Sequence, residues 1–155
     1  MELYRQYGPA IRRKCERMMG NTEDAEDVMQ ALFLSLWDKG NTEVEFPYLY
    51  RAATNRCINE LRNRKKQRAL LSREGRGEPS ASRINTQENR VSSSQLISNL
   101  VSRIDKKSAE ILVYYYLDDM TQEEIADLMK ISRRTIGKKL KKIRLCAAEL
   151  ELEAC

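Results

Sequence analysis

The 155-residue sequence contains no histidine. This absence excludes histidine acid–base catalysis, Ser–His and Cys–His nucleophiles, and every metal site that needs an imidazole. The four cysteines stand at positions 15, 57, 146 and 155, and no two of them have the CxxC spacing. We therefore expect neither a metal nor a cofactor, and we expect the cysteines to be thiols in a reducing compartment.

Aromatic residues and long apolar runs are also scarce. Aromatics make up only 6% of the chain, which disfavours a large β-sandwich or barrel. No apolar run approaches the roughly 20 residues needed to cross a bilayer, and the first residues lack the apolar segment of a signal peptide. These features predict a soluble cytoplasmic protein without membrane insertion. Hydrophobic residues, at 41%, suffice for one domain or two small ones.

The positive charge is concentrated in two blocks. Residues 51–76 carry 9 basic and 2 acidic side chains, and residues 132–155 carry 7 and 3, so their net charges are +7 and +4. Residues 1–50 and 77–131 each carry a net charge of −3. Two basic blocks in acidic surroundings are typical of a protein with two contact regions for a polyanion, although two solvated helix faces would give the same pattern.

A polar stretch, residues 72–94, divides the chain. It holds six serines, two glycines and a proline, with only three apolar residues. Such a composition predicts a flexible linker, because too little apolar surface is available for burial. We therefore predict an N-terminal domain, residues 1–71, and a C-terminal domain, residues 95–155, each near the lower size limit for independent folding.

Helical periodicity on both sides of the linker predicts an all-α fold. Pro9 is expected to bound or kink the first helix, Asn21 or Thr22 to cap the second, and Pro47 to lie in the first turn of the third. The tyrosine-rich segment 111–117 could pass for a strand by propensity, but its flanks favour a buried helix. The expected helices cover approximately residues 3–19, 22–37, 47–66, 96–104 and 111–117, followed by two short helices.

The last part of the chain has the layout of a helix-turn-helix. Residues 121–124, TQEE, form a capping box, and Ser132 can cap the second helix. Lys130 stands in the turn, where a positive φ often selects glycine, and Gly137 inside the second helix costs about 1 kcal/mol relative to alanine. A plain helical hairpin would share this pattern, but the basic second helix favours DNA binding.

The second helix of this pair buries one face and presents a basic one. Arginine and lysine can pair with guanine edges in the major groove, while other cations neutralise phosphates. The apolar positions are Ile136, Leu140, Ile143 and Ala147. The candidate DNA-binding residues are Ser132, Arg133, Arg134, Thr135, Lys138, Lys139, Lys141 and Lys142.

The third predicted helix of the N-terminal part is also two-faced. Its apolar stripe contains Tyr50, Ala53, Cys57 and Leu61. The opposite stripe contains Arg51, Asn55, Asn59 and Arg62. A row of amides and guanidiniums suits base edges and phosphates, although an ordinary solvated face is the simpler alternative.

Three blocks of the sequence follow known motifs. Residues 24–37, DAEDVMQALFLSLW, match the pattern DAED-x-x-Q-x-x-F with a following tryptophan. Residues 48–62 are similar to the pattern W-L-x-x-I-A-x-N…D-x-x-R, with Tyr48 for tryptophan and Asn59 for aspartate. Residues 123–140 are similar to E-E-I-A…S…T-V-x-x-x-L. With its blocks in this order, the chain resembles the extracytoplasmic-function (ECF) group of the bacterial sigma-70 family, and the resemblance covers nearly the whole chain outside the linker.

The resemblance implies a sigma factor rather than an enzyme. Such a protein binds core RNA polymerase and directs promoter recognition, promoter opening and transcription initiation. The helix at residues 24–37 would face the clamp helices of polymerase, and the C-terminal helix pair would read the −35 element and touch the flap. An anti-sigma factor is a further partner that the family allows and that the sequence does not identify.

The resemblance also assigns residues to these partners. Phe33 in the polymerase set could equally be a core residue. The polymerase-binding residues would be Asp27, Gln30, Phe33 and Trp37. The −10 element would be bound by Arg51, Asn55, Asn59, Arg62, Arg64, Lys65 and Lys66, with Arg68 as a further phosphate contact. The −35 element would be read by the eight residues of the C-terminal helix named above.

Three other functions compete with this interpretation. A DNA-binding regulator that never contacts polymerase would leave residues 24–37 without a role. A recombinase or nuclease would need an activated nucleophile or metal-binding carboxylates beside the DNA face, and the carboxylates cluster elsewhere. A protein-only adaptor would leave both basic helices unexplained. The acids at 24–27 could hold Mg²⁺, but acids are common in a first helical turn.

Overall fold

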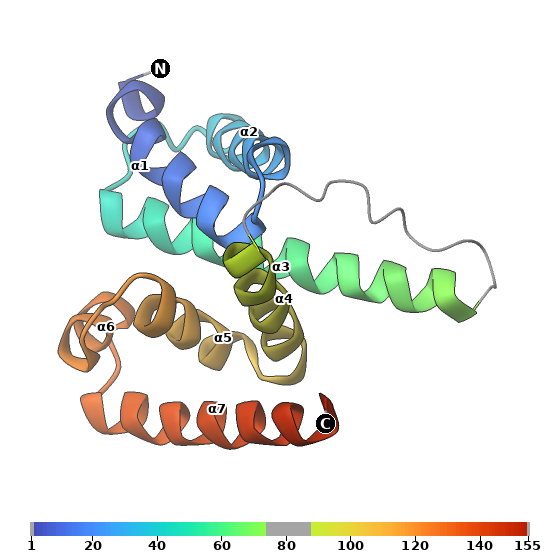
Figure 1. The fold of residues 1–155 in the computed structure, drawn as a ribbon. Coiled ribbons are helices and arrows are strands. Elements are labelled where there is room, and N and C mark those ends of the chain that lie inside the picture. Colours follow the sequence, from blue (N-terminus) through green and yellow to red (C-terminus); the bar gives the residue numbers. More distant parts are fainter. Residues whose placement is uncertain (1, 74–87, 155) are drawn as a thin grey trace.

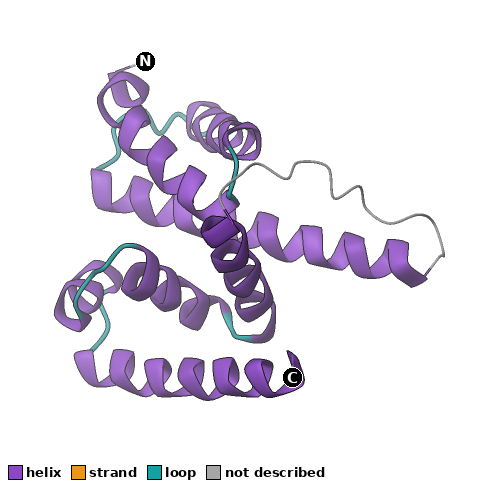
Figure 2. Ribbon diagram, viewed as in Figure 1, coloured by secondary structure: helices purple, strands orange, loops and turns teal. Residues whose placement is uncertain are grey.

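A computed structural model describes residues 2–73 and 88–154, and within them the fold is all-helical, as predicted (Figures 1 and 2). The N-terminal half consists of three helices and the C-terminal half of the remainder. The elements are α1 (Glu2–Met19), α2 (Thr22–Asp38), α3 (Phe46–Arg73), α4 (Glu88–Arg103), α5 (Lys106–Leu112), the π-helix η1 (Val113–Leu117), α6 (Gln122–Met129) and α7 (Arg133–Ala154).

Several helix boundaries follow the sequence signals. The Asn21 side chain accepts a hydrogen bond from the backbone N–H of Asp24 at 2.8 Å and caps α2. Pro47 occupies the first turn of α3. Pro9, in contrast, lies inside α1, which continues through it from Glu2 to Met19.

Other boundaries differ from the prediction. Helix α3 continues to Arg73 rather than ending near Lys66, because residues 67–73, QRALLSR, contain good helix formers and neither glycine nor proline. Helix α7 has 22 residues and is not short. Residues 72–73 and 88–94 of the predicted linker belong to α3 and α4, and residues 74–87 lie outside the described part of the chain.

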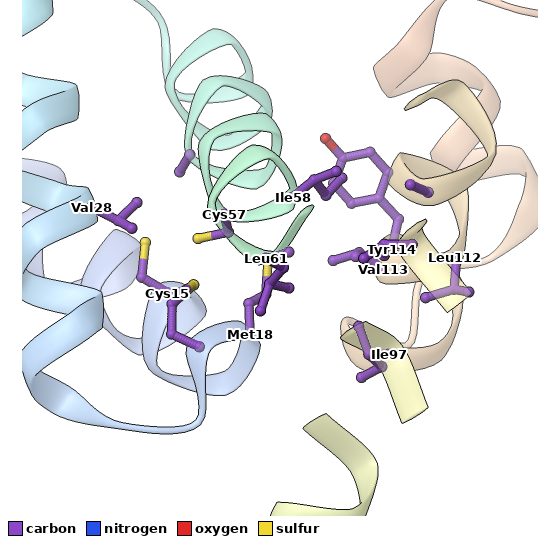
Figure 3. Close-up of a cluster of buried hydrophobic side chains, with 14 of the residues drawn as sticks. Cys15, Met18, Val28, Cys57, Ile58, Leu61, Ile97, Leu112, Val113 and Tyr114 are labelled. Carbon is purple, nitrogen blue, oxygen red and sulfur yellow. The ribbon is translucent and has the colours of Figure 1, made fainter. Parts of the chain in front are cut away.

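Helix α3 belongs to the N-terminal half and faces the C-terminal half (Figure 1). On one side it packs against α1 and α2, and on the other against α4 and α5. Figure 3 shows Cys57 directed toward Cys15 and Val28, and Ile58 directed toward Tyr114. A single cluster of buried hydrophobic side chains therefore extends from α1 to α7.

The helices of the described part include none that is both long enough and apolar enough to cross a membrane.

Candidate nucleic-acid interface

The two arginines predicted to face DNA on α3 are bound to the C-terminal half. Arg51 Nε donates to Glu110 Oε1 at 2.7 Å, and its Nη2 donates to Oε2 at 3.4 Å. Arg62 donates to the backbone carbonyls of Val101 at 2.8 Å and Ile104 at 2.5 Å. These carbonyls lie at and just past the end of α4, where the helix dipole favours a cation.

Glu110, on α5, forms a buried polar cluster with Arg51 of α3 and Tyr114 of η1. Its side chain is 4% exposed and also accepts a hydrogen bond from the Tyr114 hydroxyl at 2.8 Å. The hydrogen bond to Glu110 raises the pKa of Arg51, while burial and the negative charge of Glu110 raise the pKa of Tyr114. The Arg51 side chain is thus 38% exposed, and its positive charge is already paired with the Glu110 carboxylate.

A second cluster joins α1 to the residue after η1. Lys14 and Asp118 form an ion pair at 2.5 Å, with side chains 1% and 4% exposed, and Arg17 Nη2 donates to the other carboxylate oxygen at 3.0 Å. The Lys14 ammonium lies 4.1 Å from the ring centroid of Tyr50, a cation–π contact. Burial lowers the pKa of Lys14, an effect that Asp118 opposes.

The remaining predicted −10 residues differ in their surroundings. Asn55 is half-buried, whereas Asn59 and Lys66 are exposed. Lys65 Nζ donates to Ser102 Oγ at 2.7 Å, which is another contact with the C-terminal half.

Arg64 is held within the N-terminal half. It bridges Asp24 at 2.7 Å and Glu60 at 3.2 Å, and its side chain is 28% exposed. The seven residues thus belong to one helix, but they do not form one open surface.

The helix-turn-helix has the expected local geometry. Thr121 and Glu124 form the capping box of α6, Lys130 has φ +55° in the turn, and Ser132 Oγ accepts from the Thr135 N–H at 3.2 Å. Ile136, Leu140 and Ile143 are buried, and Ala147 is half-buried. The buried stripe fixes which side of α7 faces outward.

A groove of about 630 Å³ runs along the basic side of α7. Five basic side chains line this groove, four of them predicted to bind DNA. Gly137 also lines it and, having no side chain, does not fill it. The lining residues are Gln122, Arg133, Arg134, Gly137, Lys138, Leu140, Lys141 and Arg144.

Lys139 is turned away from this groove. Its ammonium lies 3.3 Å from Asp105 Oδ2, and its side chain is 23% exposed. Ser132 and Lys142 are exposed on α7 or at its start, and Thr135 is half-buried.

The predicted polymerase-binding residues lie on α2 and split into two environments. Asp27 and Gln30 are exposed, and Trp37 has an exposed fraction of 59%, which is high for so large an apolar side chain. Phe33 is 8% exposed and packs edge-on against Tyr4, with ring centroids 5.0 Å apart. Phe33 thus belongs to the core beneath the exposed side of α2.

Sequence reasoning did not single out Lys14, Arg17, Gln122 or Arg144. The two residues on α1 lie about 100 positions from Asp118, so no local pattern could pair them. Arg144 follows Lys141 by three residues and so lies on the same basic face of the helix, and this spacing would have predicted it from the sequence. Within the described residues, no three histidine, cysteine or acidic side chains are grouped as a metal site requires.

Two family models match separate parts of the chain. Residues 3–67 match the family Sigma-70 region 2, and residues 94–146 match Sigma-70, region 4. One relative, the ECF RNA polymerase sigma factor SigW of Bacillus subtilis (strain 168), is 28% identical over 144 residues, covering 84% of this chain and 76% of the relative.

A solved structure has the same fold. The sigma factor RpoE from Bartonella quintana, in a co-crystal with the anti-sigma factor NepR, matches with a TM-score of 0.52 and 17% identity, over 96% of this chain and 94% of that one.

These matches, in this order along one chain, define a protein with sigma-70 regions 2 and 4. The chain belongs to the sigma-70 family, in its ECF group. It is a sigma factor, an initiation factor that binds core RNA polymerase and promoter DNA and directs transcription initiation.

Proposed function

We propose that α3 engages the opened −10 element, that α7 reads the −35 element as duplex, and that α2 docks on the clamp helices of polymerase. The observation that supports this assignment best is the basic groove along α7. It lies on the second helix of a helix-turn-helix, inside the segment that matches Sigma-70, region 4. The protein would act in the cytoplasm, where polymerase and promoters are, and would catalyse no reaction itself.

The polymerase contact would be made by the outer side of α2. Asp27, Gln30 and Trp37 are exposed there, whereas Phe33 supports them from below. An exposed tryptophan is a typical anchor in protein interfaces. Helix α6 and the turn at Lys130 are available to the polymerase flap.

On α3, Asn55 is the proposed reader of a flipped base, because an amide can both donate to and accept from a Watson–Crick edge. Asn59 would assist it. The proposed phosphate contacts are Arg51, Arg62, Arg64, Lys65 and Lys66.

On α7, the side chains at the groove would contact base edges and phosphates together. Arg133 and Arg134 lie in the first turn, which enters the major groove in helix-turn-helix proteins. The proposed −35 set is Ser132, Arg133, Arg134, Thr135, Lys138, Lys139, Lys141 and Lys142. An anti-sigma factor would be a further partner, as NepR is for the Bartonella quintana protein.

The test is binding to bacterial core RNA polymerase freed of sigma. The purified chain is mixed with core polymerase and separated by size exclusion, and we expect stoichiometric co-elution that a known sigma factor displaces. A Trp37→Ala variant should co-elute less, while Leu145→Ala, which removes another exposed apolar side chain, on α7, should not.

A DNA-binding regulator that acts without polymerase is the main alternative. It predicts retention of DNA fragments by the chain alone and elution as a free small protein in the presence of polymerase from several bacterial groups. That result would leave only the helix-turn-helix assignment in place.

A further inference from the structure

We propose that Gly137 and Gln122 together read one A·T base pair of the duplex that α7 enters. The glycine leaves room for the thymine methyl group, and the glutamine pairs with the adenine. The inference rests on the proposed function, because it takes the groove side of α7 as the face for the −35 element. It adds two uncharged residues to an interface built mainly from cations.

The fold does not require a glycine at position 137. This residue lies inside α7 and its φ is not positive. A Cβ built on it would meet one atom of the described residues outside the local helix, Gln122 Oε1, at 3.7 Å, which is an ordinary van der Waals contact. Alanine would therefore fit, and it is the better residue in the middle of a helix. The missing side chain thus points to a requirement outside the protein.

The cations that would hold DNA surround this position. On a helix surface, the neighbours of a residue lie one, three and four positions away. Around Gly137 two of these six neighbours, Ile136 and Leu140, are buried, and the other four are basic and line the groove. The four are Arg133, Arg134, Lys138 and Lys141. A duplex held by these side chains comes closest to the α7 backbone at Gly137.

The dimensions of the major groove give this close approach a use. An α-helix with its side chains is about 10–12 Å wide, and the major groove is about 12 Å wide. The residue at the centre of the contact therefore determines how deeply the helix enters. Without a Cβ, which would stand about 1.5 Å from the Cα, the backbone itself can touch a base edge. A bare Cα suits the thymine methyl group, which is the apolar feature of that edge.

Gln122 supplies the polar part of the same site. It is the first residue of α6, it is half-buried, and its Oε1 lies next to Gly137. Its side-chain amide makes no hydrogen bond within the described part of the chain. A glutamine amide can pair with N6 and N7 of adenine, using its oxygen as acceptor and its NH₂ group as donor. Adenine pairs with thymine, so the two residues select the same base pair.

The test uses Gly137→Ala and Gln122→Ala in the full chain, each reconstituted with bacterial core RNA polymerase. Each complex selects from a pool of DNA duplexes with a random segment, and the bound fraction is sequenced. For the wild type we expect two elements, with an A·T position in the upstream one. Both variants should lose the preference at that position alone and bind the wild-type sequence about tenfold more weakly, the usual effect of one mismatched pair.

The stability of Gly137→Ala separates this role from a structural one. Because alanine favours the helix, the variant should melt about 2–4 °C higher than the wild type even though it binds DNA more weakly. The matched control is Gly8→Ala inside α1, where a Cβ would meet the Tyr4 ring at 3.7 Å. It should also raise the melting temperature, and it should select the wild-type sequence.

The salt dependence of Gln122→Ala separates base reading from charge. This change removes no cation, so the slope of log affinity against log salt should stay at the wild-type value, whereas Lys138→Ala should reduce it. Uniform weakening of all sequences by Gln122→Ala, with the A·T preference intact, would make this residue a phosphate contact and overturn its assignment.

Other results would overturn the inference at Gly137. They are wild-type selectivity in the Gly137→Ala complex, a lower melting temperature for this variant, and an upstream element without an A·T position. These outcomes leave the proposed function standing, because the wild-type complex still selects an upstream element. Absence of that element from the wild-type selection would refute the proposed function of α7, and this inference with it.

Discussion

Asn55 is the polar residue of α3 on which the proposed reading of the −10 element depends. It is half-buried and lies one helical turn beyond Arg51. Asparagine is a mediocre helix former, so a functional reason for its presence is expected. Its amide carries two donors and an acceptor, enough to read one base edge.

We therefore predict that Asn55→Ala impairs promoter opening and leaves polymerase binding intact. Opening is followed by permanganate reactivity of unpaired thymines on a promoter fragment retained by the reconstituted complex. The matched change Asn63→Ala, at an exposed residue two turns further along α3, should open the promoter normally. Equal loss of polymerase co-elution in Asn55→Ala would contradict the assignment.

Asp105 is a residue whose role is structural and depends on pH. It caps α5, accepting from the backbone N–H of Ser108 at 3.3 Å and from its hydroxyl at 2.5 Å. Partial burial would raise the pKa of Asp105, but the Ser108 hydrogen bonds and the Lys139 charge prevail and lower it to about 2. A carboxyl with a lowered pKa stabilises the fold above its unfolded pKa of about 4, and this contribution disappears as the pH falls toward 2.

Asp105→Ala should accordingly destabilise the chain by about 1 kcal/mol at pH 7, the usual effect of losing an N-cap. The ion pair with Lys139 adds little, because the Asp105 side chain is 59% exposed. Urea unfolding between pH 7 and pH 2 checks this, and the gap between variant and wild type should close as the pH falls. Asp127→Ala, at an exposed position on α6, should show no such gap.

At the scale of helices, local patterns predicted the elements but not all of their faces. The capping box at Thr121 and the positive φ at Lys130 depend on neighbouring residues, so the sequence alone predicted them. The second buried stripe of α3, with Thr54 and Ile58, was not, because its partners lie on η1, about 60 residues away. Arg51 and Arg62 were predicted to bind DNA because of their guanidinium groups. Their partners in the fold, Glu110 and the Val101 carbonyl, are distant in sequence and appear only in the tertiary structure.

Helix α7 gives the prediction at this scale. Lys138 lines the basic groove and is exposed, so it is placed to neutralise a phosphate. Lys138→Ala should weaken binding to a duplex −35 fragment and reduce the slope of log affinity against log salt by about one unit. Lys107→Ala removes the same charge from an exposed position on α5 and should leave the slope unchanged. An equal change of slope in both variants would show that net charge, not the groove, determines binding.

At the scale of the whole molecule, one hydrophobic cluster serves both halves. Ile58 is 1% exposed on α3 and points toward Tyr114 of the C-terminal half (Figure 3). Ile125 is fully buried in α6, which packs against α7 and η1. Truncation of isoleucine to alanine removes a similar apolar side chain at each site. At Ile58 the lost contacts lie at the junction of the two halves, and at Ile125 they lie inside the C-terminal half.

Ile58→Ala should therefore weaken the packing between the two halves, whereas Ile125→Ala should destabilise the C-terminal half. Each truncation costs about 2–5 kcal/mol of packing when the side chain is fully buried. For Ile58→Ala we expect a larger radius of gyration by small-angle X-ray scattering with unchanged helix content, because the lost contacts join one half to the other. For Ile125→Ala we expect a lower melting temperature with an unchanged radius of gyration. If Ile58→Ala instead leaves the chain compact and lowers the melting temperature as much as Ile125→Ala does, the two halves unfold together as one cooperative unit.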